Sequence, residues 1–514
     1  MRASTFFVWK NKVYQSHFSC SFLDKIQLEL RHFQREKNLM RLLTKKNDCS
    51  ENTYRVLAFV VLIVMTGITV LPNSAAAQAN SEHPVTFTKD VAPILQRSCQ
   101  GCHRPNSVAP MSLLTYEEVR PWARAIKDKV SRPDNDPERM PPWFIEKNIG
   151  VQNFKEDISL SPDEVNIIRA WTDNGAPRGN AADLPPAIEW VDGEDWSFGT
   201  PDLVISSPEH TLEAVAADWY GLLDQSPTGL TEDRWVKSVE VRERLLDEAA
   251  VERKSGDLNL FAVHHAVISA RERTTEIQTQ ARGTGERGSP DLFFLVHEVG
   301  QNASNYPDVL GVRLPAGSSL NWDLHLHSIG VEIPFRIDVA FKFHPKGWEP
   351  KYKGRGGLES FLTFDLDIRP EDPNARMEGL QRVTKPGIMM TFEPHLHSSG
   401  KRMCVEAIYP HGVSEMLSCA GYNHNWVKVY VYDEDSAPLL PAGTLLRVTA
   451  WYDNTLNNPR VSDPRNWKGY GNRSTDDMFL NLSRFVSITD EQFEEEQARR
   501  AELERQRTIN AQNN

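Results

Sequence analysis

Histidines that could hold a metal ion occur as three close pairs in this chain. It has 15 histidines, and six of them form the pairs His264 with His265, His325 with His327, and His395 with His397. Two histidines one residue apart in an extended segment place both imidazoles on one face of a strand, where they can chelate a metal. Adjacent histidines in a regular strand point to opposite faces. His264 and His265 can therefore share a metal only at a strand end or a bulge.

A methionine downstream of the last pair indicates which metal. Met478 lies near the end of the same β-rich stretch as His395 and His397. Imidazole combined with thioether suits copper in both oxidation states, whereas zinc rarely takes methionine. We therefore predict one copper site at His395, His397 and Met478. We predict a second copper site at His264 and His265 together with one histidine of residues 325–327.

Other histidines carry no such pattern. The alternative for any one pair is a packed core or surface histidine, and this is our expectation for the unpaired His297, His411 and His424.

A different metal motif lies nearer the N-terminus. The sequence Cys99-Gln100-Gly101-Cys102-His103 is the attachment motif of c-type haem, in which both thiols bond to the porphyrin and the histidine binds the iron. A lone C-x-x-C could instead hold zinc or act as a redox dithiol. Zinc would need two more nearby ligands, and no second C-x-x-C follows. The adjacent histidine favours haem.

The second axial ligand of that haem would be a methionine or histidine further along. We predict Met140, in Arg139-Met140-Pro141-Pro142-Trp143, because prolines fix an extended loop and a thioether ligand raises the reduction potential. Met111 is the alternative, although it follows His103 by only eight residues.

Helical patterns surround the haem motif. Val91, Ile94 and Leu95 have helical spacing and lead into Cys99. Residues 115–130 are expected to form a helix, and another begins at residues 161–164, with proline in its first turn. We predict a small all-α cytochrome c domain over residues 80–185, followed by a linker over 186–200.

The remainder has the pattern of β-sandwiches. Short β-rich runs alternate with glycine, proline and asparagine turns. We predict two all-β sandwiches over residues 201–345 and 346–487, and a charged, helical tail over 488–514. This multidomain arrangement agrees with the length of 514 residues, which is too long for one core. The net charge of -12 argues against a nucleic-acid partner.

The first 79 residues are expected to be a presequence and signal peptide. An apolar run over residues 56–71 follows Lys45, Lys46 and Arg55, and small residues come after it. A membrane anchor is the alternative, but the run is shorter than the ~20 residues of a spanning helix. Met40 is an alternative start. We expect a periplasmic or secreted protein that meets a membrane only through this segment, if it is not cleaved.

Two resemblances extend these predictions. Residues 87–102, 140–143 and 168–177 resemble bacterial cytochrome c domains fused to copper monooxygenase-like modules. The order of an adjacent histidine pair, a strand histidine, H-x-H and methionine over residues 200–487 resembles the type II copper monooxygenases, the peptidylglycine α-hydroxylating and dopamine β-hydroxylating enzymes. The resemblance implies jelly-roll-like sandwiches. It also implies an electron-relaying copper at His264, His265 and His325, with His327 as the alternative third ligand, and a dioxygen-binding copper at His395, His397 and Met478.

The sequence also departs from that family. Peptide-amidating enzymes carry arginine two residues before H-x-H, where this chain has Glu393, so a peptide carboxylate is not the expected substrate. The family's usual disulfides are missing. Only Cys404 and Cys419 remain in the β-rich part, flanking a hairpin turn at residues 410–413. We predict that they form a disulfide, with two buried thiols as the alternative.

These patterns together predict a copper monooxygenase that hydroxylates a C–H bond. Its partners would be a small organic substrate, dioxygen and an external electron donor, with electrons relayed by a covalent haem c to two copper ions. The alternatives are a non-catalytic electron-transfer or copper-binding protein of the same fold, and a structural relative with vacant sites.

Overall fold

The computed structural model describes most of residues 84–513. The residues within this range that it does not describe are 106, 108, 191–195, 218, 248–262, 272–291, 299–302, 308, 329, 353–360, 363–365, 472 and 474. The predicted signal peptide therefore lies outside the described residues. Pro84–Asn514 is one compact unit. None of the helices in the described ranges is long and apolar enough to cross a membrane.

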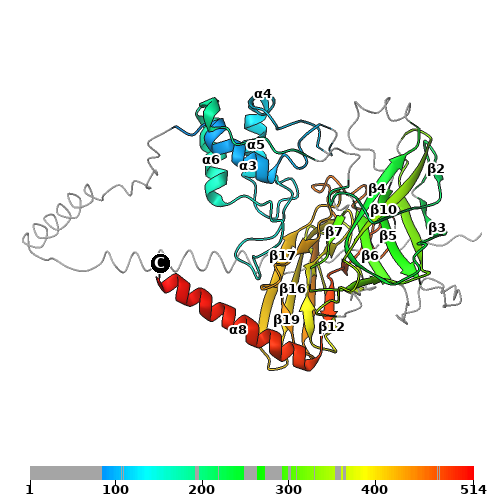
Figure 1. The fold of residues 1–514 in the computed structure, drawn as a ribbon. Coiled ribbons are helices and arrows are strands. Elements are labelled where there is room, and N and C mark those ends of the chain that lie inside the picture. Colours follow the sequence, from blue (N-terminus) through cyan, green and yellow to red (C-terminus); the bar gives the residue numbers. More distant parts are fainter. Residues whose placement is uncertain are drawn as a thin grey trace, which may run out of the picture. The chain divides into compact units, whose positions relative to one another are not determined.

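Short helices precede and follow the C-x-x-C-H motif in the chain and lie together in one part of the molecule (Figure 1). They are η2 (Phe87–Val91), α3 (Ala92–Ser98), α4 (Tyr116–Val119), η3 (Arg120–Trp122), α5 (Ala123–Val130), α6 (Pro162–Asp173) and η4 (Ala181–Asp183). The predicted start of α6 is confirmed, because Ser161 and Glu164 form a capping box with Pro162 in the first turn. These helices share a small core that includes Phe87, Leu95 and Trp171.

We predict a separate all-α domain from the sequence. In the structure, this helical part does not form a clear domain of that kind. Residues between α5 and α6 leave the helices and join the β-sheets: Ile145 forms an antiparallel bridge with Ala420, and Phe154 forms one with Tyr432. Trp143 and Ile145 also belong to the core of the β body. Backbone groups of this segment pair with a sheet edge, which keeps the chain extended here.

The first sandwich consists of two sheets. One contains β1 (Leu203–Ser206), β10 (Ile333–Phe343), β4 (Arg234–Leu245) and β7 (Ala303–Asn305) in that order, with β2 (His210–Leu212) on β10 and β8 (Val312–Leu314) on β4. The other has the order β3 (Trp219–Pro227), β9 (Ser319–Leu326), β5 (Val263–Arg271) and β6 (Leu292–Glu298). Alternating buried positions along β8 and β9 contribute to the core.

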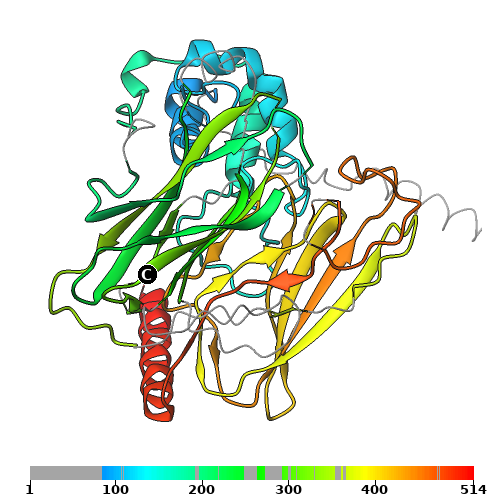
Figure 2. The same ribbon diagram turned by 90° about the vertical axis from the view of Figure 1, so that its right-hand side faces the viewer.

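The second sandwich follows in the chain (Figure 2). Its largest sheet has the order β12 (Ala375–Arg382), β20 (Leu445–Tyr452), β16 (Gly400–Ile408) and β17 (Ser414–Gly421). Short strands form its other sheets: β11 (Phe361–Leu362) and β15 (Pro394–His395) flank β21 (Leu480–Asn481), β19 (Leu439–Leu440) and β22 (Phe485–Ser487) flank β13 (Gly387–Met389), and β14 (Thr391–Phe392) pairs with β18 (Tyr430–Val431). One hydrophobic core includes residues of both sandwiches. The prediction of all-β sandwiches is confirmed.

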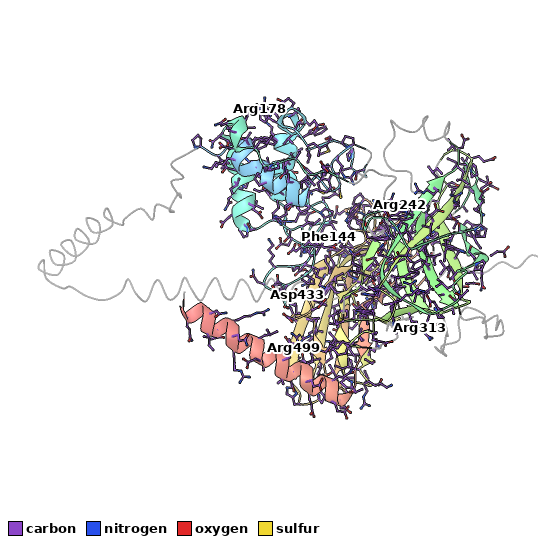
Figure 3. The ribbon with its side chains drawn as sticks, in the orientation of Figure 1. Phe144, Arg178, Arg242, Arg313, Asp433 and Arg499 are labelled. Carbon is purple, nitrogen blue, oxygen red and sulfur yellow. A yellow bond between two sulfur atoms is a disulfide. The ribbon has the colours of Figure 1, made fainter. Side chains whose placement is uncertain are left out.

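The charged C-terminal segment forms the helix α8 (Asp490–Asn513). Its first half is docked instead of being a wholly solvated tail. Glu496 is buried, accepts hydrogen bonds from Tyr352 and Lys351, and pairs with Arg499 and Arg500 of its own helix. Arg499, which is labelled on α8 in Figure 3, also donates a hydrogen bond to the carboxylate of Asp435 in the second sandwich. A buried carboxylate with several cationic partners explains why this charged sequence packs against the β body.

Candidate metal centre

A β-bulge brings the adjacent histidine pair to one place. In the pairing of β5 with β9, Val263 is opposite Leu326 and His265 is opposite His325, with an irregularity between Val263 and His265. His264 is therefore the extra residue of the bulge, where alternation of side chains is interrupted. The adjacent pair had to sit at a strand end or bulge to share a metal, and the bulge meets that requirement.

The bulge produces a compact group of three imidazoles. Donor atoms of His264, His265 and His325 all lie within 4.8 Å of one another. The ring centres of His264 and His325, and of His265 and His325, are 4.9 Å apart. Two imidazoles bound to one ion at about 2.0 Å have ring centres about 5 Å apart at tetrahedral angles. These residues therefore fit one metal ion.

His327, the alternative third ligand, adjoins this group. Its ring centre lies 4.6 Å from that of His264, yet it is not among the three residues whose donor atoms converge. His325 is fully buried, whereas His327 is partly exposed. The geometry therefore favours His325.

The H-x-H pair lies at the end of β15. His395 is the last residue of that strand, and His397 lies two residues after it. His395 pairs with Leu480 of β21, and Pro394 pairs with Asn481. The strand pairing ends there, and the backbone N–H of His397 instead donates to the carboxylate of Asp477, the residue before Met478. The two histidine rings have centres 5.5 Å apart. The segment that carries Met478 is thus held next to H-x-H through Asp477.

Asp477 holds these two segments together. Its buried carboxylate accepts hydrogen bonds from the backbone N–H groups of His397 and Ser399, both at 3.1 Å, and from the Ser399 hydroxyl. Burial raises the pKa of Asp477, and the Ser399 hydroxyl opposes that change. The backbone of His397 is thereby fixed beside the residue that precedes Met478.

The environment keeps the histidines in the form that binds metals. Burial, and then the neighbouring histidines, lower the pKa values of His264 and His397 well below the usual value. The Nδ1 atom of His397 lies 3.1 Å from the carbonyl oxygen of Arg473, which leaves Nε2 as its ligand atom. Neutral imidazole is the species that coordinates a metal.

The two histidine sets lie next to each other. Ring centres of His265 and His395, from different sandwiches, are 6.4 Å apart. His424, which the sequence had left unassigned, lies between the sets: its ring centre is 5.0 Å from that of His264 and 5.4 Å from that of His397. Its sequence neighbours contain no second histidine within two residues, so no spacing signal identified it. The side chain of His297 lies outside the described part, and His411 is exposed.

The C-x-x-C-H motif has the features that haem attachment requires. Cys99 and Cys102 are free thiols and partly exposed. The Nδ1 atom of His103 lies 3.3 Å from the carbonyl oxygen of Met111. Such a contact fixes the imidazole tautomer and leaves Nε2 for a metal. The motif therefore fits a covalent haem with His103 as its iron ligand.

The two candidates for the second haem ligand differ in their packing. Met111 packs against the core of the helical part. Met140 is 41% exposed and so is not committed to a core. Met140 is therefore the freer of the two side chains to serve as a ligand.

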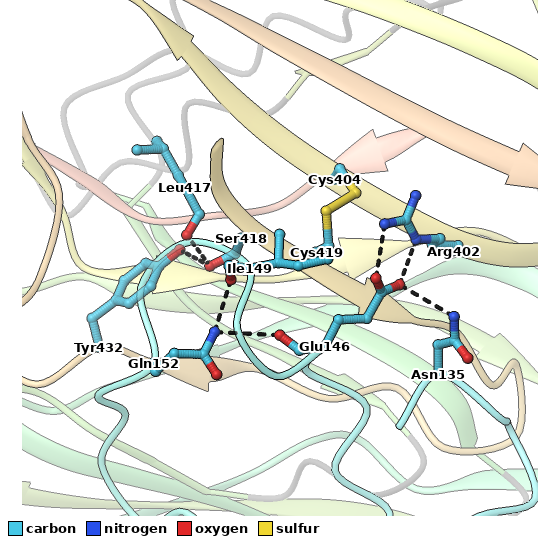
Figure 4. The surroundings of a disulfide bond; sticks show 10 residues. All are labelled: Asn135, Glu146, Ile149, Gln152, Arg402, Cys404, Leu417, Ser418, Cys419 and Tyr432. Carbon is cyan, nitrogen blue, oxygen red and sulfur yellow. Dashed lines mark hydrogen bonds and ion pairs between the residues drawn. A yellow bond between two sulfur atoms is a disulfide. The ribbon is translucent and has the colours of Figure 1, made fainter. Parts of the chain in front are cut away.

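The segment after Met140 is attached to β17 beside a disulfide (Figure 4). The N–H of Glu146 donates to the Cys419 carbonyl oxygen at 2.9 Å, and its carboxylate receives two hydrogen bonds from Arg402. Cys404 and Cys419 are direct partners in the pairing of β16 with β17 and form a disulfide, which confirms the prediction. Residues 144–151 thus form an arm on the second sandwich.

A cavity of about 340 Å³ lies next to this arm. Its lining includes Trp143, the residue before the arm, Tyr306 of the first sandwich, and the cations Lys155, Lys428 and Arg484. Burial lowers the pKa of Lys428, and the neighbouring Glu156 and Cys102 oppose that effect. No histidine lines the cavity. The cavity is therefore distinct from the histidine sets.

Comparisons with known proteins do not assign this chain to a family. No protein-family model and no curated protein matches this chain. Solved structures give weak likenesses. A structure of Broad Bean Stain Virus has 7% identity and a TM-score of 0.25, over 59% of this chain and 97% of that one. A tandem CBM22 domain from Paenibacillus barcinonensis has 8% identity and a TM-score of 0.15, over 56% of this chain and 99% of that one. Likenesses this weak carry no argument about fold or function.

Proposed function

We propose that this protein is an exported copper-dependent monooxygenase that receives electrons through a covalently attached c-type haem. The observation that carries the proposal is the convergence of His264, His265 and His325 at a bulge, beside the H-x-H pair and the segment that carries Met478. Imidazole with thioether favours copper over zinc.

Two ligand sets would divide the work. His264, His265 and His325 form a set of imidazoles only, which suits an electron-relaying ion. His395 and His397, together with Met478 of the adjoining segment, would form a mixed set that suits a dioxygen-binding ion. Bound copper would supply the one-electron and dioxygen chemistry needed to hydroxylate a C–H bond. The protein's own contribution is to keep the imidazoles neutral and to fix His397 through Asp477 and Arg473.

Transfer of electrons from the haem to copper is supported by contacts of the second sandwich. These contacts are made with the helical part that contains the haem motif. Asn423 donates its side-chain N–H to the Pro137 carbonyl oxygen at 2.8 Å, and Arg460 pairs with Glu138 at 3.1 Å. Pro137 and Glu138 lie three and two residues before Met140, the proposed axial ligand. These contacts attach the loop of Pro137 and Glu138 to the second sandwich, and one of them is made by Asn423, the residue before His424. An external donor would reduce the haem.

The substrate would be a small organic molecule. Glu393 is buried next to H-x-H, and its carbonyl oxygen accepts from the N–H of Leu482. A carboxylate at this position disfavours a peptide carboxylate as substrate. The proposed substrate is therefore a small organic molecule that is hydroxylated at a C–H bond, and not a peptide with a free carboxyl terminus.

The test is product analysis under labelled dioxygen. Full-length holoprotein, reduced and supplied with a panel of small organic substrates, should yield an alcohol that contains one labelled oxygen atom. Met478→Ala should abolish the product and leave haem absorbance unchanged. Unchanged hydroxylation by Met478→Ala would refute the assignment of the oxygen site.

Two observations favour a second candidate, a non-catalytic copper-binding or electron-transfer protein. The described cavity contains no histidine, and histidines of the two sets are close to one another. A protein of this kind would bind copper and exchange electrons with the haem, but would give no oxygenated product with any substrate.

A further inference from the structure

His424 occupies a tightly held turn between the two histidine sets. The turn follows β17, and the N–H of Trp426 donates to the Asn423 carbonyl oxygen at 3.0 Å. Both residues that precede His424 are held by hydrogen bonds. Tyr422 donates its hydroxyl to the Leu396 carbonyl oxygen, and the Asn423 side chain donates to the Pro137 carbonyl oxygen. The backbone that leads into His424 is therefore anchored.

The imidazole of His424 is buried without a hydrogen-bond partner at one nitrogen. The residue is 9% exposed, and Nδ1 has no hydrogen-bond partner among the described residues. Burying an unsatisfied polar atom costs about 1–3 kcal/mol. A metal ion bound at Nδ1 would satisfy this atom.

His397 has a matching orphan atom. Its Nε2 is also buried without a hydrogen-bond partner in the described part of the chain, while its Nδ1 faces the Arg473 carbonyl oxygen. The ring centres of His397 and His424 are 5.4 Å apart, close to the 5.5 Å between His395 and His397. These distances agree with the spacing of about 5 Å for two imidazoles on one tetrahedral ion.

The contact of His424 with the set of His264, His265 and His325 is weaker evidence that His424 is a ligand there. Its ring lies 5.0 Å from that of His264, but the converging donor atoms in that set are those of His264, His265 and His325, without His424. That set already has three ligands. The H-x-H set has only two imidazoles, and of the two sets it is the one that lacks a third.

We propose that His424 is a ligand of the metal ion held by His395 and His397, so that this ion has three imidazoles with Met478 as a fourth ligand. The proposal rests on the proposed function in that it assumes copper at H-x-H. It adds a ligand outside the paired-histidine pattern and changes what each ligand does. Imidazoles support both copper oxidation states, whereas the softer thioether favours Cu(I). Loss of Met478 should therefore weaken Cu(I) more than Cu(II), and loss of His424 should weaken both.

The experiment is a copper titration of the full-length, haem-containing protein after removal of copper. Wild type, His424→Ala and a control, His411→Ala, are titrated with Cu(II) against a chelator of known affinity. His411 is exposed and stacks on Tyr409, so its loss should leave both affinities unchanged. For His424→Ala we expect the affinity of one of two copper ions to fall at least about 10-fold, since even indirect supports of a metal ligand cost 10–100-fold. Pulsed electron paramagnetic resonance should count one coordinated imidazole fewer.

Rescue separates a ligand from a packing residue. In His424→Gly, added imidazole can enter the vacated space and should restore the lost copper affinity, which it could not do if His424 only supported the fold. Haem absorbance and the unfolding transition are recorded for every variant.

The outcomes separate this inference from the function that it assumes. Equal copper affinity and nitrogen count in wild type and His424→Ala would overturn the role of His424 and leave the proposed function standing. A folded His424→Gly protein whose affinity loss imidazole does not restore would also overturn it. Wild type that binds no copper at all would overturn both.

Discussion

The Tyr422 hydroxyl donates a hydrogen bond to the carbonyl oxygen of Leu396, the residue between His395 and His397. Both residues are buried. This bond joins the turn that carries His424 to the H-x-H segment, although Tyr422 and Leu396 are 26 residues apart in the sequence.

Removal of this hydroxyl tests the link between turn and metal site. Tyr422→Phe leaves a buried carbonyl oxygen without its donor, which should lower the free energy of unfolding by about 1–3 kcal/mol. Copper affinity should fall several-fold, because the position of His424 relaxes. Chemical denaturation and copper titration measure the two effects. Tyr409→Phe, which removes an exposed hydroxyl bonded to Glu415, is the matched control; an equal loss of copper affinity in both variants would contradict the link.

The Cys404–Cys419 disulfide should stabilise the second sandwich. It closes a loop with a sequence separation of 15, and a loop of about that length contributes roughly 3 kcal/mol by restricting the unfolded chain. Cys404→Ser with Cys419→Ser should lower the free energy of unfolding by about this amount. Haem absorbance should stay unchanged. Thiol counting on denatured, unreduced wild-type protein checks the bond itself; four reactive thiols in haem-free mature protein would contradict it.

The ion pair of Glu146 with Arg402 should hold the arm of residues 144–151 on β17. Glu146→Ala leaves a half-buried guanidinium without its carboxylate partner, at a cost of about 1–2 kcal/mol. Limited proteolysis should cut within the arm faster than in wild type. Glu378→Ala removes an exposed ion pair with Arg376 and should leave the cleavage rate unchanged. Equal rates in both variants would show that the ion pair does not hold the arm.

Acid should undock the first half of α8. Burial raises the pKa of Glu496, but hydrogen bonds from Arg499 and Arg500 outweigh this and lower it to about 2. A carboxyl group whose pKa is lower in the folded state stabilises the fold fully above its unfolded pKa, about 4.3. That contribution should disappear as pH falls from about 4.3 towards 2. Hydrogen exchange in residues 490–500 should rise over this range in wild type. Glu496→Gln should already exchange fast at pH 7, and slow exchange there would count against this role.

Met140 and Met111 make different predictions for the haem. Met140→Ala should retain covalent haem but lower its reduction potential, because a thioether ligand raises the potential. Met111→Ala should leave the potential close to that of wild type. Potentiometric titration followed by haem absorbance measures both. The reverse pattern would assign the axial position to Met111.

Local periodicity accounts for what the sequence could predict. Alternation of side chains along strands required a bulge or strand end at His264 and His265, and the structure has that bulge. The hairpin turn at residues 410–413 placed Cys404 opposite Cys419. Both predictions depend only on residues near one another in one or two strands.

Features that depend on packing between distant segments could not be predicted. The closeness of His265 to His395 arises where the two sandwiches meet, and no pattern within either strand determines it. His424 is a single histidine in a turn, a pattern shared by many surface residues. The arm leaves the helical part because its backbone pairs with β17, and the apolar residues Trp143 and Ile145 fit either a helical or a β core.

The most direct test of the central claim is the metal content of the full-length protein after reconstitution. Copper, zinc and iron are measured by mass spectrometry, with haem from its absorbance, for wild type, His264→Ala and His395→Ala. Our account predicts two copper ions and one haem iron per chain, with one copper lost in each variant and haem unchanged. Less than one copper per wild-type chain, or zinc in preference to copper, would contradict it.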